Sequence, residues 1–274
     1  MKFCSVVLNY KSYGETLECV EALLNMNYAD SEIVIVDNGS GNESVEMIEK
    51  SFSDNPRVHI IALEKNLGFA AGNNEGIYYA REKLGADFVY VCNSDTVSHS
   101  ELFNDFLKAY KKGVGVITVP VIRPDGSYQL PDENTDDITK RIRFSITHLL
   151  MGMVLNRIRK GGAKQAQKVF EAPDSYKKYV LEGCAFCLTT DYFENYRGLY
   201  PKTFLYWEEK NLLFMIKKAN LESAVAETQP VLHKVKGSTV TDDITKFRLN
   251  HAFGSMIKSL PLYSMSRKSI SKKY

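Results

Sequence analysis

Short apolar runs alternate with amphipathic stretches along the first 122 residues of the chain. Runs rich in β-branched and aromatic residues predict strands at Phe3–Leu8, Glu32–Val36, Val58–Leu63, Phe88–Cys92 and Gly115–Val121. Apolar residues at helical spacing predict helices near Glu15–Asn25, Ser44–Phe52, Gly72–Leu84 and Ser100–Lys111. Ser12 and Glu15 have capping-box spacing at the start of the first helix. Strands separated by helices of this length favour right-handed βαβ units, so we predict an α/β fold with a mostly parallel sheet flanked by helices.

The alternation stops after Arg123. Ile142–Ile158 is apolar and potentially helical, with basic residues massed at both of its ends. Further along, the pattern predicts a strand at Tyr179–Thr189, a helix at Glu208–Lys218 and a short strand that ends near His233. We therefore divide the chain into residues 1–122, 123–240 and a basic, helical extension at 241–274.

The composition is that of a globular protein, with 44% hydrophobic and 25% charged residues. No apolar run approaches the roughly 20 residues of a membrane-spanning helix, and the first residues lack the pattern of a secretory signal. The odd count of five scattered cysteines indicates reduced thiols, so we expect a cytoplasmic protein. Cys184 and Cys187 have C-x-x-C spacing but no second pair, which favours a buried strand over a metal or redox site.

The net charge of +2 is unevenly distributed. Ten basic and two acidic residues lie between Lys140 and Lys178, and seven basic and no acidic residues lie from Lys246 to the end. Such regions on an otherwise acidic protein indicate a polyanionic partner surface, with a merely solvated face as the alternative. Ile142–Ile158 and the basic tail could dock on the inner face of an anionic membrane, cover the core or form a homodimer contact. We expect no nucleic-acid partner.

Polar residues follow the ends of several predicted strands. Ligands of parallel sheets bind beyond the carboxyl ends of the strands, and Asn9 and Asp37 fall there. The Asp37 carboxylate, on a tight turn with Asn38-Gly39-Ser40, can accept a hydrogen bond from the imide N–H of uracil or thymine. The alternative is that this sequence simply forms a good turn.

The segment from Asn66 to Asn74 is rich in small and amide residues and leads into a predicted helix. Backbone N–H groups at a helix start can face a ribose or a diphosphate, which makes candidates of Asn66, Gly68, Gly72 and Asn73. The segment is neither G-x-G-x-x-G nor Gly-Lys-Ser/Thr, which counts against a dinucleotide-binding dehydrogenase or a P-loop enzyme. Close packing of the helix on a strand is the alternative reading.

Asn93 and Asp95 come directly after the predicted strand Phe88–Cys92. A carboxylate at this edge, beside a diphosphate site, is suited to Mg²⁺ or Mn²⁺, because these cations prefer oxygen ligands. Alternatively, Asp95 caps a helix that begins near Ser98. His233, at the end of a later strand, could ligate the same metal through a neutral nitrogen or be an ordinary histidine.

Trp207, Glu208 and Glu209 precede a helix with an apolar face. Two carboxylates at a helix start are stabilised by the helix dipole, which is one reason for their presence. The same pair also supplies a candidate general base, because neighbouring carboxylates can split their pKa values and leave one ionised.

Taken in order, these segments resemble the family 2 glycosyltransferases, especially the rhamnosyltransferase-like branch of bacterial capsule and O-antigen synthesis. The series spans about residues 3–240 and consists of Asp37-Asn38-Gly39-Ser40, the segment 66–74, Asn93-Ser94-Asp95, Phe204-Leu205-Tyr206-Trp207-Glu208-Glu209 and His233. The resemblance implies a GT-A fold with a nucleotide-sugar-binding half at 1–122, merged with an acceptor-binding half at 123–240.

The resemblance also implies a role for each residue. Asp37 would contact the base, and Asn9, Asn66, Gly68, Gly72, Asn73 and Asn93 would belong to the nucleotide-sugar site. Asp95 and His233 would hold Mg²⁺ or Mn²⁺ with the donor diphosphate. Glu209, or else Glu208, would be the catalytic base, while Gly183 and Trp207 would line the acceptor side.

The implied reaction is an inverting transfer of rhamnose or a hexose from a dTDP- or UDP-sugar to a hydroxyl of a lipid-linked or cell-surface polysaccharide precursor. The chain departs from the family pattern in having one acid in Asn93-Ser94-Asp95, Glu209 where Asp is common, and Lys210-Asn211-Leu212 after it. A catalytically weakened nucleotide-sugar-binding protein is therefore one alternative. A sugar nucleotidyltransferase is another, although no glycine-rich basic loop follows the first strand.

Overall fold

The structure is a computed structural model that describes residues 1–129, 147, 151, 181–235 and 244–274. Apart from residues 147 and 151, the predicted stretch Ile142–Ile158 lies outside the described residues, as does nearly all of the basic region 140–178. Within the described ranges, none of the helices combines the length and the apolar character that a membrane span requires.

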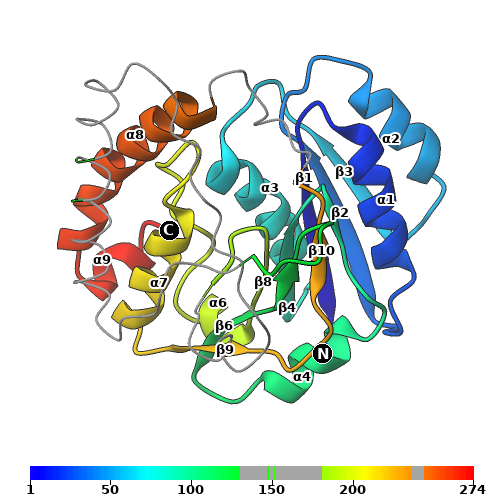
Figure 1. Ribbon diagram of the computed structural model, residues 1–274. Helices are drawn as coiled ribbons and strands as arrows, with labels where there is room; N and C mark the ends of the chain where they lie inside the picture. The colour runs from blue at the N-terminus through cyan, green and yellow to red at the C-terminus, as the bar shows by residue number, and fades with distance from the viewer. Residues whose placement is uncertain (130–146, 148–150, 152–180, 236–243) are drawn as a thin grey trace.

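A seven-stranded sheet forms the centre of the molecule (Figure 1). Its strands, in spatial order, are β3 (Val58–Ala62), β2 (Ser31–Asp37), β1 (Phe3–Asn9), β4 (Phe88–Asn93), β8 (Ala185–Leu188), β6 (Val114–Thr118) and β9 (Glu222–Val225). β1 pairs in parallel with β2 and β4, and only β8 runs antiparallel to its two neighbours. The prediction of a mostly parallel sheet in an α/β fold is confirmed.

Helices cover both faces of this sheet, because side chains alternate along each strand. Cys4 and Val6 of β1 point into one apolar core, and Phe3 and Val7 point into the other. The first core is closed by α3 (Phe69–Glu82), α6 (Thr190–Phe193) and α7 (Glu208–Lys218), the second by α1 (Tyr13–Leu24), α2 (Ser44–Phe52) and α4 (Leu102–Ala109) (Figure 1).

A small second sheet lies beyond the end of β4. It contains β5 (Thr96–Val97), β10 (Val231–His233) and β7 (Val121–Ile122) in that order. β10 pairs antiparallel with β5, and this register places His233 opposite Thr96. A segment from the second half of the chain is thereby brought to the loop that follows β4.

The C-terminal segment is helical, with α8 (Ile244–Ser264) followed by α9 (Arg267–Ser271). It packs on the first core through Leu262, Ile270 and Tyr274, each of which is buried. The carbonyl oxygen of Tyr274 also accepts hydrogen bonds from the N–H groups of Arg197 and Gly198, at 2.7 and 3.0 Å. The basic tail is therefore tied to the first core and to the backbone at Arg197 and Gly198, so deleting it would remove part of the core.

Several local predictions need correction. The predicted strand Gly115–Val121 is divided into β6 and β7 around Pro120, which has no N–H to donate to a ladder. The capping box at Ser12 is wrong, because its hydroxyl makes no cap hydrogen bond and lies 3.3 Å from the Ser94 hydroxyl. The strand predicted from Tyr179 is confined, within the described residues, to β8. Short strands such as β5 and β9 were not predicted.

Candidate active site

The carboxyl ends of β1 and β2 meet at Asn9 and Asp37, which are paired in register. The Asn9 amide donates to Asp37 Oδ1 at 2.6 Å, and the hydroxyl and N–H of Ser40 donate to the same carboxylate at 2.5 and 3.0 Å. Asn9 also accepts from the Thr16 hydroxyl at 2.7 Å. Both side chains are buried, so this network holds the turn at the base of the predicted nucleotide site.

Asn38 joins this turn to the loop before α3. Its amide donates to Asn66 Oδ1 at 3.0 Å and its Oδ1 accepts from the Leu67 N–H at 2.9 Å. Asn66 Oδ1 accepts in addition from the N–H of Gly68 at 2.8 Å. Sequence reasoning missed Asn38 as a site residue, although its place beside Asp37 in the turn was a usable signal.

The glycines around the start of α3 allow close approach of other chain segments. Gly68 has a φ of 87°, and a Cβ there would come 2.7 Å from the Cα of Phe204. A Cβ on Gly72 would lie 2.9 Å from Leu8 Cδ1, so the helix–strand packing reading of Gly72 is correct. Asn73 is fully buried and donates to the Phe69 carbonyl at 2.9 Å, so its side chain reaches no solvent.

Asp95 and His233 lie together, as the sequence analysis predicted for a metal pair. The distance from Asp95 Oδ1 to His233 Nε2 is 3.3 Å, and the Lys234 N–H donates to the Asp95 carbonyl at 2.9 Å. Asp95 is 4% exposed. It does not cap a helix, because β5 follows it and α4 begins only at Leu102, so that alternative reading is wrong.

Two further side chains of this site were missed from the sequence. His233 Nδ1 lies 2.8 Å from Gln129 Oε1, and Gln129 Nε2 donates to Glu182 Oε2 at 2.8 Å. Glu182 adjoins the predicted residue Gly183, whereas nothing in the local pattern distinguishes Gln129. Asn93 ends β4 beside the same segment, with its N–H donating to the Cys184 carbonyl at 2.9 Å.

The side chains present fit a divalent cation. Asp95 offers oxygen and His233 offers nitrogen, and both atom types ligate Mg²⁺ or Mn²⁺. Among the residues that the structure describes, no group of three or more acidic, histidine or cysteine side chains is arranged to hold a metal ion. A cation held by Asp95 and His233 would therefore need further oxygen ligands, which donor phosphates and water can supply.

Tyr206 and Trp207 turn the chain sharply at the start of α7, with φ values of 67° and 80° in the left-handed region. Such backbone costs on the order of 1–3 kcal/mol per residue and persists only where packing holds it. The Trp207 indole supplies that packing, because it is 6% exposed against α8 and donates to the Tyr263 hydroxyl at 2.7 Å. Trp207 therefore holds in place the backbone that leads into Glu208 and Glu209.

This turn sends the two glutamates in different directions. Glu209 lies against Gly183 so closely that a Cβ at that glycine would be 2.9 Å from Glu209 Cδ. Glu208 points inward, where its Oε1 is buried with no hydrogen-bond partner. Burial and the neighbouring Glu209 raise the pKa of Glu208 to about 8.

Three carboxylates lie close enough to Cys184 to act on its pKa. The pKa of this buried thiol is raised well above its ordinary value, first by burial and then by the negative charges of Glu182, Asp95 and Glu209. Segments far apart in the chain, which carry the predicted metal ligand and the predicted base, are thus gathered around one strand end. Cys184 and Cys187 are both buried and free. The predicted buried strand is confirmed for Cys187, which lies in β8, whereas Cys184 directly precedes it.

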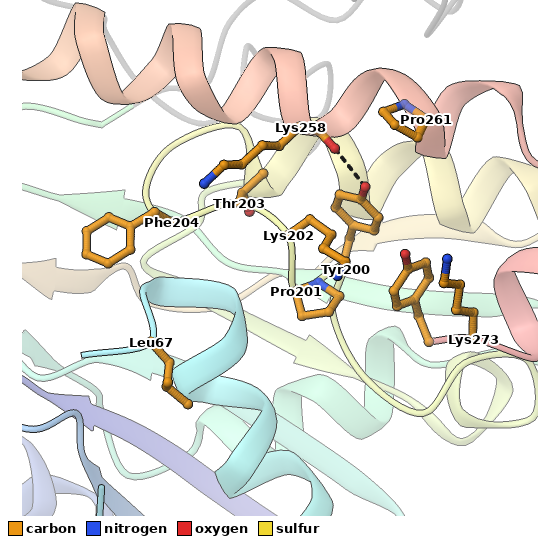
Figure 2. Close-up of a pocket in the computed structure, with 10 residues that line it drawn as sticks. Leu67, Tyr200, Pro201, Lys202, Thr203, Phe204, Lys258, Pro261 and Lys273 are labelled. Carbon is orange, nitrogen blue, oxygen red and sulfur yellow. Dashed lines mark hydrogen bonds between the residues drawn. The ribbon is translucent and has the colours of Figure 1, made fainter. Parts of the chain in front are cut away.

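A pocket of about 560 Å³ opens beside the segment 200–204, which precedes the turn at Tyr206 and Trp207. Figure 2 shows that Leu67 from the loop before α3, the segment 200–204, and Lys258 and Pro261 from α8 surround it. The Tyr200 hydroxyl donates to the Lys258 carbonyl at 2.7 Å and so ties the segment to α8. Three lysines contribute to the lining, which gives the pocket a positive charge: Lys202, Lys258 and Lys273.

We expect the stability of the Glu208→Gln variant, relative to the wild type, to increase with pH. Unfolded chains lose this proton near the ordinary pKa of 4.5, while the folded protein keeps it to about 8. Between these two pH values the folded state binds more protons than the unfolded state, so the free energy of unfolding of the wild type falls as pH rises. Glutamine has no proton to lose at this position, so the variant does not undergo this fall. Melting temperatures measured across this range test the expectation. If the melting temperatures of variant and wild type differ by the same amount at both ends of this pH range, the expectation is contradicted. The exposed Glu222→Gln variant is the control.

The family of the chain follows from its similarity to a known family. A model described as "Glycosyl transferase family 2" matches residues 4–161. The chain belongs to this family. Among curated relatives, it is 27% identical to the chondroitin synthase of Pasteurella multocida over 136 residues, which are 44% of this chain and 13% of that protein. It is 24% identical to the glycosyltransferase GlyG of Streptococcus pneumoniae over 157 residues, which are 56% of this chain and 49% of GlyG. The chain thus spans about half or less of the length of these relatives.

Solved structures confirm the GT-A fold. The S. aureus TarS fragment 1–349 in complex with UDP aligns with a TM-score of 0.57 at 15% identity, over 91% of this chain and 63% of that one. The mannosyltransferase PcManGT from Pyrobaculum calidifontis, in complex with GDP-Man and Mn²⁺, aligns with a TM-score of 0.59 at 11% identity, over 99% and 70%. The resemblance seen in the sequence to family 2 glycosyltransferases is therefore confirmed at the level of family and fold.

Proposed function

We propose that the chain is an inverting glycosyltransferase that moves rhamnose or a hexose from a dTDP- or UDP-sugar to a hydroxyl of a lipid-linked or cell-surface polysaccharide precursor. The observation that carries the proposal is the convergence of Asp95 and Glu209 at one edge of the sheet. Asn93, two residues before Asp95, donates its N–H to the Cys184 carbonyl, and Glu209 lies against the adjacent Gly183. Family membership supports it, as do the UDP and GDP-Man complexes of proteins with the same fold.

In this proposal, Glu209 is the general base. Its carboxylate takes the proton of the acceptor hydroxyl while that oxygen attacks the anomeric carbon, and the bond from this carbon to the nucleotide diphosphate breaks on the opposite face. Positioned proton transfer of this kind contributes about 10²–10⁴-fold. The geometry supports Glu209 over Glu208, because Glu208 is turned into the protein and its raised pKa keeps it largely protonated at neutral pH.

The donor would lie along the carboxyl ends of β1, β2 and β4. The turn held by Asn9 and Asp37 and the loop held by Asn38 and Asn66 would position the base and ribose. Mg²⁺ or Mn²⁺ bound by Asp95 and His233 would neutralise the charge that the diphosphate gains on leaving. Gly183, without a side chain, leaves the Glu209 carboxylate room to face the acceptor.

A panel of nucleotide sugars tests the proposed function. The purified protein should hydrolyse one dTDP- or UDP-sugar slowly in the absence of acceptor, because water can replace the attacking hydroxyl, and Glu209→Gln should abolish this release. If the protein binds a nucleotide sugar but releases no sugar from any member of the panel, the chain is the nucleotide-sugar-binding protein considered as the alternative.

The lysine-lined pocket supports an anionic acceptor and contact with a membrane. Lys202, Lys258 and Lys273 lie beside the segment that leads to Glu209, so a phosphate of a lipid-linked acceptor held there would lie near the base. Each lysine near an anionic lipid surface contributes around 1 kcal/mol to binding. In this proposal the chain divides at residues 122 and 240, and all three parts contribute to the lining of the pocket.

The variant with Lys202, Lys258 and Lys273 all changed to glutamine should bind phosphatidylglycerol vesicles much more weakly than the wild type. Three contributions of around 1 kcal/mol correspond to a loss on the order of 10²-fold. Co-sedimentation with anionic and with neutral phosphatidylcholine vesicles measures it. A matched variant with the exposed Lys50, Lys83 and Lys112 changed to glutamine should bind as the wild type does. Equal losses in both variants, or no binding to anionic vesicles at all, would contradict the proposed contact.

A further inference from the structure

A large aromatic side chain is exposed in the wall of the lysine-lined pocket. Phe204 is 37% exposed, although it directly follows the buried Thr203 (Figure 2). Its position is fixed, because its carbonyl oxygen accepts from the Phe69 N–H at 2.7 Å and a Cβ at Gly68 would lie 2.9 Å from its ring carbon Cδ2. The ring therefore lies where the loop before α3, which belongs to the proposed donor site, meets the pocket.

Two rings from α8 extend this aromatic surface. His251 is stacked with Phe204, with ring centroids 5.6 Å apart and an angle of 28° between the ring planes. Phe247 lies next, with its ring centroid 4.3 Å from that of His251. Phe247 and His251 are four residues apart, so they share one side of the helix. Both are partly exposed, so the three rings form a surface that a ligand can reach.

The same side of α8 continues with a glycine and a lysine. Gly254 and Lys258 follow His251 by three and seven residues, a spacing that keeps all three on one side of a helix. Apart from the helix itself, no atom of the described residues lies within 4 Å of the point that a Cβ of Gly254 would occupy. This open space forms a notch. Figure 2 shows the Lys258 side chain extending toward Phe204, with its amino group at that end.

We propose that this surface binds the sugar ring of a glycosyl phosphate acceptor, with one face of the ring on Phe204, its edge in the notch at Gly254 and the phosphate at Lys258. The C–H groups on the face of a pyranose ring carry partial positive charge, whereas the face of an aromatic ring is negative. Ligand sites generally combine such apolar walls with a few charged groups that fix orientation. The inference rests on the proposed function, because it names the acceptor of that reaction.

The order of the groups supports an acceptor at this place. Phe204 contacts Gly68 of the proposed donor loop on one side, and the lysines of the pocket lie on the other. A sugar on Phe204 would therefore lie between the donor and the phosphate site. A lipid headgroup without a sugar would use the lysines, but it would make no use of an exposed aromatic ring and a notch beside it.

Titrations with glucose 1-phosphate, galactose 1-phosphate and N-acetylglucosamine 1-phosphate, followed by NMR, test the inference. The wild type should bind at least one of them more tightly than inorganic phosphate, and UDP should not displace it. Phe204→Leu should weaken this binding by about 3–10-fold and leave the affinity for inorganic phosphate unchanged, whereas Phe204→Tyr should preserve both affinities. Lys258→Gln should weaken the binding of both kinds of ligand to the same extent.

Gly254→Leu tests the notch without removing a contact. Leucine is a better helix former than glycine, so α8 should be no less stable, while the new side chain should fill the notch and exclude the sugar ring. Binding of the glycosyl phosphate should be lost, and inorganic phosphate should still bind. Gly14→Leu is the matched control, since Gly14 lies in α1 with no described atom outside that helix within 4 Å of a Cβ there. It should leave both affinities unchanged.

Equal affinity of the wild type for inorganic phosphate and for all three glycosyl phosphates would overturn the inference. Displacement by UDP would also overturn it, because the sugar phosphate would then occupy the donor site. So would unchanged binding of the glycosyl phosphate in Phe204→Leu or in Gly254→Leu. These measurements involve no sugar transfer. A protein that hydrolyses a nucleotide sugar but shows none of these losses contradicts this inference alone, and one that shows the losses but releases no sugar contradicts the proposed function alone.

Discussion

Replacing Glu209 with glutamine is expected to lower turnover at least about 10²-fold while leaving the affinity for the donor nearly unchanged. The amide keeps the size of the side chain against Gly183 but cannot accept the proton of the acceptor hydroxyl. A group that acts in the transition state affects kcat and kcat/KM together, so the KM for the donor should stay close to that of the wild type. Steady-state kinetics with the donor identified in the panel measure both constants.

The comparison with Glu208→Gln makes this prediction specific. Glu208 is largely protonated at neutral pH because its pKa is raised to about 8, so glutamine resembles the form already present. Its turnover should fall far less than that of Glu209→Gln. If Glu208→Gln abolishes turnover and Glu209→Gln does not, the assignment of the base is wrong.

Removing divalent cations with EDTA is expected to abolish transfer, and Mg²⁺ or Mn²⁺ should restore it. Only two protein ligands, Asp95 and His233, lie together in the described part of the site, so the cation should bind mainly with the donor diphosphate. Asp95→Asn should therefore weaken donor binding at saturating metal by more than it weakens binding of the free nucleoside. Calorimetric titrations with UDP and with uridine compare the two affinities.

Full activity in EDTA would refute the metal assignment. In that case the counter-charge of the leaving diphosphate would have to come from lysine or arginine. Lys234, which follows His233 and pairs with Glu18, is the cation nearest in sequence to the proposed metal ligands. Lys234→Gln serves as the matched test, since it should change turnover little if the cation is a metal ion and strongly if it is this lysine.

The alternation of short apolar runs with helical stretches was enough to predict the α/β architecture. β1, β2, β3 and β4 lie within one residue of their predicted bounds. Each is a short run rich in β-branched and aromatic residues, a pattern that can be read from neighbours in the chain. Predictions failed where a long-range partner decides the structure. β5 is two residues long and exists because β10 pairs with it, and the Ser12 hydroxyl contacts Ser94 instead of its own helix.

The candidate site could be predicted only in part. Asp37, Asn66 and Asp95 were found because polar residues at the ends of parallel strands must gather at one edge of the sheet. Three residues of the site were missed, because only their hydrogen bonds to distant segments place them there: Asn38, Gln129 and Glu182. Gln129 lies 104 residues from His233 and 53 from Glu182, and no local pattern marks such pairs.

The sequence by itself determined the order of strands and helices, the buried strands and the family, because local periodicity and the order of polar segments along the chain carry that information. The tertiary structure alone decided which glutamate faces Gly183 and which is buried, because the left-handed turn at Tyr206 and Trp207 aims both and packing against α8 holds it. It also decided that His233 meets Asp95 and which of its nitrogens faces the carboxylate, since both depend on the pairing of β10 with β5 and on a glutamine from a distant loop.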